Sequence, residues 1–149
     1  MAFWDQRMRF RLIDRTRAID ERNTRRLRAI IESHGWPGSD LVGEQAADAA
    51  WLLVQHSDHD AAFQQRCLEL MREAAARGVA STKNLAYLED RVRIASGRPQ
   101  LYGTQLERRG GRLAPTEIED PEHVDERRAQ VGLGPLAEYL ADTDRLQLG

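Results

Sequence analysis

The sequence contains a single cysteine, Cys67, among its 149 residues. One cysteine can form neither an internal disulfide nor a cysteine-based zinc site, so both are excluded as ways of holding the chain together. Cys67 lies at the apolar spacing of a predicted helix, which favours a core residue over a nucleophile. A chain without disulfides is typical of the cytoplasm, where we expect this protein to work.

The sequence also lacks long apolar runs and the motifs of nucleotide-binding enzymes. No run approaches the roughly 18 to 20 residues that span a bilayer, and the start lacks the apolar segment of a secretory signal. There is no glycine-rich phosphate loop, no GxSxG elbow and no dinucleotide-binding fingerprint. We therefore expect no membrane partner and no nucleotide cofactor.

Lysine is nearly absent, and arginine carries the positive charge, a composition that suits a bacterium with a GC-rich genome. The net charge is −2, but nine arginines against five acidic residues give residues 1–33 a balance of +4, which leaves −6 for the remainder. Arg7, Arg11 and Arg15 form one stripe at intervals of four. A solvated helix face explains this stripe, so nucleic acid is not an expected partner, while contact with another partner stays open.

Composition and apolar spacing predict one mainly helical domain over residues 1–149, since 41% of the residues are apolar and 31% are charged. The expected fold class is mainly α: a single-domain bundle of about five to seven helices. A small β-hairpin is expected near residues 101–118, where Leu101–Leu106 alternates before a tight turn at Arg109–Arg112. The predicted helices span 3–19, 24–33 (capped by Asn23 or Thr24), 44–56, 58 or 60 to 77, 81–97, 120–131 and 135–141.

The densest group of titratable side chains follows the most apolar predicted helix, 44–56. It is the stretch Gln55-His56-Ser57-Asp58-His59-Asp60. We expect His56 or His59 to act as general acid–base, with Asp58 or Asp60 orienting it and Gln55 contacting the substrate. The simpler alternative is that Asp58 caps the next helix, His56 ends the previous one, and the other side chains lie in solvent.

The same stretch offers metal ligands, because two histidines three residues apart share a helix face or a helix junction. A divalent metal held by His56, His59 and Asp60 is therefore an open hypothesis, with hydrolysis as the expected reaction. The zincin pattern is absent. His59-Asp60 is similar to the metal-binding pair of HD-type phosphohydrolases, but that family needs a further upstream histidine and a distal aspartate. The candidates for a further ligand are Glu44, Asp90 and His34.

A second polar cluster begins at Asp90-Arg91 and continues in the segment 102–105. Arg91 can pair with a carboxylate or phosphate, and the hydroxyl and amide groups of the segment can orient a polar ligand. The alternative is that Arg91 pairs with a structural aspartate and Tyr102 packs at the edge of the hairpin. The residues expected to bind substrate here are Arg91, Tyr102, Thr104 and Gln105, with Trp36 closing the pocket.

Specific motifs are spread along nearly the whole chain. They are Gly35-Trp36-Pro37 with Leu41-Val42-Gly43, Ala50–Asp60 with Phe63-Gln64, Asn84–Leu88 with Asp90-Arg91-Val92, and Gln100 with Tyr102–Gln105. Together they resemble a widespread family of small proteins classed only as a domain of unknown function. The resemblance implies no activity. It does imply a polar site, because two separate motifs contain polar residues that a core alone would not require.

The leading hypothesis from the sequence is an enzyme that acts on a small polar molecule or a peptide through His56 or His59. The floor of its pocket would be the end of the third predicted helix, and its wall would be Arg91, Tyr102 and Gln105. The competing hypothesis is a non-catalytic module that binds a protein or a metabolite through this pocket or through the arginine stripe.

Overall fold

The computed structural model describes the backbone of residues 2–147 and the side chains of residues 14–146. It confirms a mainly helical fold with one two-stranded antiparallel hairpin. Within the described backbone, no helix combines the length and apolar content that a bilayer-crossing segment needs. The elements are α1 (Ala2–His34), α2 (Ser39–Val42), α3 (Glu44–Gln55), α4 (Ala61–Ala76), α5 (Thr82–Ala95), β1 (Leu106–Arg109), β2 (Arg112–Pro115), the 3₁₀ helix η1 (Pro121–His123), α6 (Val124–Gln130) and α7 (Leu136–Gln147).

The first helix is one continuous element, whereas the sequence predicted two helices with a break near Asn23. No proline or glycine interrupts this stretch, and Thr24 does not act as a cap. Its hydroxyl donates to the carbonyl of Asp20 within the same helix at 2.7 Å. Thr24 also shares a buried face with Leu27 and Ile31, so packing against the bundle holds the helix straight through the expected break. The side chains of Arg7 and Arg11 lie outside the described residues.

Two predicted helix starts are confirmed by side-chain caps. The carboxylate of Asp60 accepts the N–H of Phe63 at 3.0 Å at the start of α4. The hydroxyl of Ser81 accepts the N–H of Asn84 at 3.2 Å at the start of α5. Each cap satisfies a backbone donor that has no partner inside the first turn, so both boundaries are fixed locally.

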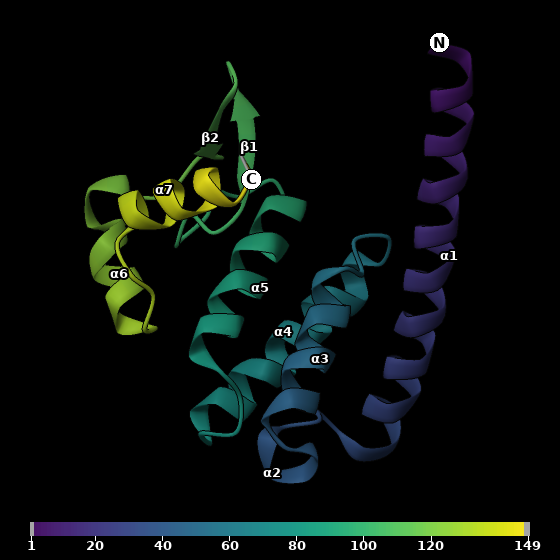
Figure 1. The fold of residues 1–149 in the computed structure, drawn as a ribbon. Helices are drawn as coiled ribbons and strands as arrows, with labels where there is room; N and C mark the ends of the chain where they lie inside the picture. Colours follow the sequence, from purple (N-terminus) through teal and green to yellow (C-terminus); the bar gives the residue numbers. More distant parts are fainter. Residues whose placement is uncertain (1, 148–149) are drawn as a thin grey trace.

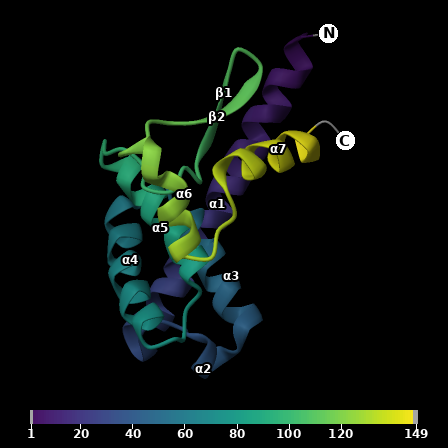
Figure 2. The same ribbon diagram turned by 90° about the vertical axis from the view of Figure 1, so that its left-hand side faces the viewer.

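Four helices, α1, α3, α4 and α5, surround the apolar core (Figures 1 and 2). Cys67 is fully buried there, as predicted, and burial raises the pKa of its thiol to about 12. Trp36 also belongs to this core and is 6% exposed, so its ring packs inside the bundle. The largest fully buried apolar side chains are Leu68, Met71, Leu88 and Val54.

The C-terminal part of the chain, with the hairpin, α6 and α7, packs beside α5 on the side away from α1 (Figure 1). The predicted strand at Leu101–Leu106 is wrong, because β1 begins only at Leu106. The backbone N–H groups of Leu101, Tyr102 and Thr104 instead donate to the carboxylate of Asp90. The hairpin turn is Gly110-Gly111, with φ of 57° and 82°, which confirms the predicted turn.

Candidate functional site

Asp58 and Arg91 form a two-point ion pair between the loop after α3 and the C-terminal half of α5. Nε of Arg91 donates to Oδ1 of Asp58 at 2.8 Å, and Nη2 donates to Oδ2 at 2.5 Å. Two parallel bonds fix the plane of the guanidinium as well as its position. The structure thus joins one residue from each of the two polar clusters that the sequence suggested separately.

Two glutamine side chains extend this pair on either side. Nη1 of Arg91 donates to Oε1 of Gln105 at 3.0 Å. Nε2 of Gln64 donates to Oδ1 of Asp58 at 3.1 Å and to the carbonyl of Val54 at 3.0 Å. Gln64 is 1% exposed, so its amide is a rigid part of the wall. We call Asp58, Gln64, Arg91 and Gln105 the Asp58–Arg91 site.

The Asp58–Arg91 site borders a cavity of about 350 Å³. All four of its residues line this cavity. The rest of the lining is mostly apolar and comes from the end of α5, the start of β1 and the residue after β2: Ile94, Ala95, Leu106 and Thr116. An apolar lining with a few converging polar groups is typical of a small-molecule site.

Two buried polar atoms of α3 have no partner among the described residues: Nε1 of Trp51 and Oε1 of Gln55. These residues are one turn apart and share a face of the helix. Asp48 of α3 bonds to Asn84 of α5 at 2.7 Å, and the ring of Trp51 contacts that of Tyr87 edge-on at 6.0 Å. The same parallel register places Gln55 opposite Arg91. The unpaired oxygen therefore lies at the level of the Asp58–Arg91 site, although Gln55 does not itself line the cavity.

Arg91 also sets the charge state of Asp58. Its hydrogen bonds hold the pKa of Asp58 below the usual value of 3.8, and burial opposes this effect. The hydrogen bond from Gln64 and the charges of Arg91 and His56 lower the pKa further. Asp58 is therefore an ionised acceptor near neutral pH, and it is not suited to donate a proton.

The ion pair predicts an acid-dependent loss of stability. Because the pKa of Asp58 is lower in the folded chain, its contribution to the free energy of unfolding is complete well above the usual pKa of 3.8 and is lost as the pH falls through the lowered pKa. We expect the stability advantage of the wild type over Asp58→Asn, measured by urea unfolding, to shrink over this range. The same comparison in an Arg91→Gln background should show little pH dependence. A pH dependence that survives there would rule out Arg91 as its cause.

The four predicted catalytic residues do not all meet at one point. His56 ends α3, where its backbone N–H donates to Leu52, and both His56 and His59 are exposed. Asp60 caps α4 and pairs with Arg28 of α1, on another side of the junction. Among the residues whose side chains are described, no three histidine, cysteine, aspartate or glutamate side chains are grouped as a metal ion would need. The metal hypothesis at His56, His59 and Asp60 therefore has no support from the geometry.

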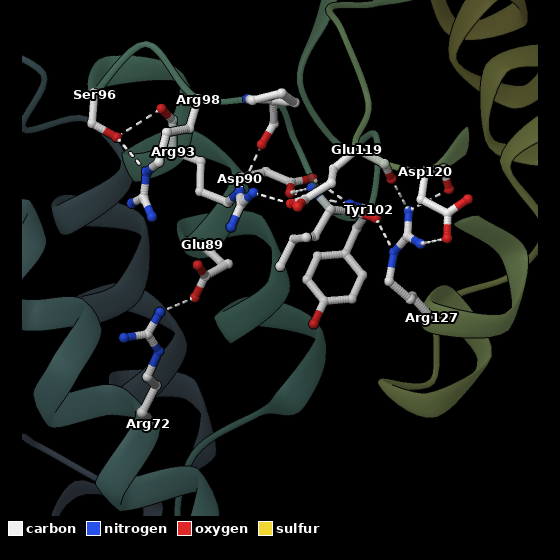
Figure 3. A network of polar contacts seen from close by, with 12 residues as sticks. Arg72, Glu89, Asp90, Arg93, Ser96, Arg98, Tyr102, Glu119, Asp120 and Arg127 are labelled. Carbon is white, nitrogen blue, oxygen red and sulfur yellow. Dashed lines mark hydrogen bonds and ion pairs between the residues drawn. The ribbon is translucent and has the colours of Figure 1, made fainter. Parts of the chain in front are cut away.

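The residues of the second predicted cluster have different roles in the structure. Asp90 is fully buried and accepts bonds from the segment 101–104, including the hydroxyl of Thr104 at 2.9 Å. That hydroxyl in turn accepts Nε2 of Gln105 at 3.1 Å, so Thr104 supports the Asp58–Arg91 site from behind. Tyr102 lies among Glu89, Asp90 and Arg127 (Figure 3), and burial raises the pKa of its hydroxyl. Tyr102 and Trp36 are not part of the cavity lining.

Comparison with known proteins identifies the family. The model of a family of unknown function, DUF6624, matches residues 1–146. The chain belongs to this family. No curated protein and no solved structure gives a match. The match confirms the resemblance drawn from the motifs, and it brings no activity to this member of DUF6624.

Sequence reasoning on this DUF6624 chain missed Gln64 as a site residue. Its position in the sequence could have revealed it. Gln64 precedes Leu68 by one turn on the buried face of α4, where the helical pattern calls for an apolar side chain. An amide at such a position needs hydrogen-bond partners, which Val54 and Asp58 supply. Thr116 and the apolar lining of the cavity gave no such signal, because only the tertiary fold brings β2 to α5.

Proposed function

We propose that this protein binds a small polar molecule or a short peptide in the cavity at the Asp58–Arg91 site. One observation supports the proposal most directly: the oriented Asp58–Arg91 ion pair and a set of apolar side chains line the same cavity. At about 350 Å³ the cavity is near the lower end of the range for small-molecule sites, roughly 300 to 1,000 Å³. That volume suits a ligand the size of an amino acid or a dipeptide.

The free hydrogen-bonding capacity of the site indicates the chemistry of the ligand. Arg91 has five N–H donors, and three of them are used within the site. The side chain of Asp58 is 59% exposed, so its carboxylate can accept further bonds. A ligand that carries a donor and an acceptor close together meets both needs. Amino-acid zwitterions and peptide groups have this pattern.

The unpaired atoms of Trp51 and Gln55 support a polar occupant near this wall. A buried donor or acceptor without a partner costs about 1 to 3 kcal/mol. A ligand group that reaches Oε1 of Gln55 would recover part of that cost on binding. This favours ligands with an N–H group over purely anionic ones.

Acid–base catalysis by His56 is the second candidate function. The observation that favours it is that His56 lies near enough for its charge to lower the pKa of Asp58. Its ring is exposed at the loop that carries Asp58, so it can meet a substrate that extends out of the cavity. His59 is exposed as well. We propose the cytoplasm as the compartment, consistent with a single buried cysteine.

A thermal-shift screen with amino acids and dipeptides tests the binding proposal. We expect some members to raise the melting temperature of the wild type, and Arg91→Gln to reduce their affinity about tenfold or more, because a charged hydrogen bond is worth about 1.5 to 3 kcal/mol. Arg77→Gln, at an exposed position at the end of α4, is the matched control and should keep wild-type binding. Equal affinities in Arg91→Gln and wild type would refute the site.

The same ligands separate binding from catalysis. Each binder is incubated with wild type and with His56→Ala, and its chemical change is followed by NMR. Turnover by the wild type that His56→Ala abolishes, with binding retained, would establish the enzyme. Binding without any change in either protein would leave a binding module.

A further inference from the structure

The exposed side of α1 carries four arginines without ion-pair partners among the described residues. They are Arg15, Arg22, Arg25 and Arg26, and we call them the basic face. Arg15, Arg22 and Arg26 are spaced by seven and four residues, so they lie along one side of the helix, with Arg25 beside them. Arg17 and Arg28, by contrast, pair with Glu21 and Asp60 on other sides.

Part of the helix that carries the basic face is exposed to solvent on every side. Every residue from 14 to 19 is exposed, including Ile19 at 47%. Further along, Ile30 is 41% exposed beside a groove of about 180 Å³ that Arg26 and Leu53 also line. A helical segment that buries no apolar face lacks the tertiary packing from which most helix stability comes, which favours a partner.

A segment of opposite charge lies elsewhere on the same chain. The acidic segment, residues 117–126, holds six carboxylates and neither lysine nor arginine, and all six of these residues are exposed. Within the described structure Glu119 pairs with Arg93 and Asp120 with His123 and Arg127, whereas Glu117, Glu122 and Glu126 form no ion pair. Glu122 and Glu126 are four residues apart, the same sequence spacing as Arg22 and Arg26.

The two charged surfaces of one molecule cannot meet. The acidic segment includes η1 and the start of α6, and the helices of the core separate this part of the chain from α1 (Figure 1). Nucleic acid is a poor occupant of the basic face, since the chain outside residues 1–33 carries −6 and would repel it. A second copy of the chain presents the complementary charges.

We infer that the protein associates head to tail, with the basic face of one copy on the acidic segment of the next. Such a contact uses two different surfaces, so it closes into a ring or continues as a chain. Exposed ion pairs are individually weak and screened by salt. The association is therefore concentration-dependent and strongest at low ionic strength. It involves no residue of the Asp58–Arg91 site and does not depend on the proposed function.

Sedimentation velocity of the full-length chain after nuclease treatment tests this inference. We expect the average mass to rise above the 17.0 kDa monomer with concentration at about 20 mM salt, and to return to it at about 500 mM salt. Arg22→Glu/Arg26→Glu and Glu122→Arg/Glu126→Arg should each remain monomeric. The control Arg66→Glu/Arg77→Glu makes the same charge change at exposed positions, one in α4 and one directly after it, and should associate like the wild type.

Mixing the two reversed variants is the decisive step. One reversed variant then offers carboxylates on α1 to the guanidinium groups introduced on η1 and α6 of the other, and the two unchanged surfaces also match. An equimolar mixture should therefore regain mass that neither variant shows alone. A wild type that stays monomeric at low salt, an association that survives both reversals, or a mixture that remains monomeric would overturn the inference.

Discussion

Asp90→Ala is expected to lower the free energy of unfolding by about 4 kcal/mol, in the range reserved for loss of a buried polar network. The Asp90 carboxylate is fully buried on α5. It accepts the N–H groups of Leu101 at 2.7 Å, Tyr102 at 3.1 Å and Thr104 at 3.0 Å, and the hydroxyl of Thr104. Alanine would leave these buried donors unpaired, at about 1 to 3 kcal/mol for each one that water cannot reach.

Urea unfolding measures the total loss, and hydrogen exchange locates it. We expect the amides of Leu101, Tyr102 and Thr104 to lose their protection, while those in the middle of α4 keep it up to the new global limit. Asp90→Asn is the matched control, since it retains one acceptor oxygen and the volume of the side chain. It should cost about half as much. A loss below about 1 kcal/mol in Asp90→Ala would show that the segment 101–104 is held by other contacts.

The role of Asp90 also shows why part of the fold escaped prediction. Alternation of apolar and polar residues at Leu101–Leu106 is the pattern of a strand. Here the backbone donors of the segment go to a side chain eleven or more residues upstream, and pairing starts only at Leu106. No local rule reports such a contact. By contrast, α3, α4 and α5 have strong apolar periodicity, and the last two have side-chain caps, which are local features that sequence does report.

Individual residues of the candidate site were predicted from the sequence, but the way the fold groups them was not. Arg91 and Gln105 were expected to contact a ligand and Asp58 to orient a histidine, and the fold brings these three residues to one cavity. The histidines were chosen for their density of titratable groups, yet the turn after α3 directs His56 and His59 to solvent. Which side chains of a polar loop face inward depends on the path of that loop. Packing of α4 and α5 decides this path, and the spacing of residues 55–60 does not.

Arg128→Met is expected to lower the free energy of unfolding by about 3 kcal/mol, because Arg128 joins α6 to the segment 101–104 and to α7. This residue is 2% exposed. Its Nε donates to the carbonyl of Gly134 at 2.6 Å and its Nη1 to that of Tyr102 at 2.7 Å. The guanidinium also lies 5.1 Å from the centre of the Tyr139 ring. Methionine keeps much of the apolar stem and leaves both carbonyls without these charged donors.

Lysine cannot replace this arginine, and that makes the prediction specific. A single ammonium group lacks the planar fork that reaches two carbonyls while stacking on a ring. Arg128→Lys should therefore lose nearly as much stability as Arg128→Met. Arg145→Met, which removes an exposed arginine that contacts only Asp142 and the carbonyl of Ala141 among the described residues, should change stability by less than about 0.5 kcal/mol. Wild-type stability in Arg128→Lys would mean that charge alone, without the fork, holds α6 and α7 in place. Selective loss of hydrogen-exchange protection in α6 and α7, with α4 unaffected, would instead show that Arg128 stabilises these two helices locally.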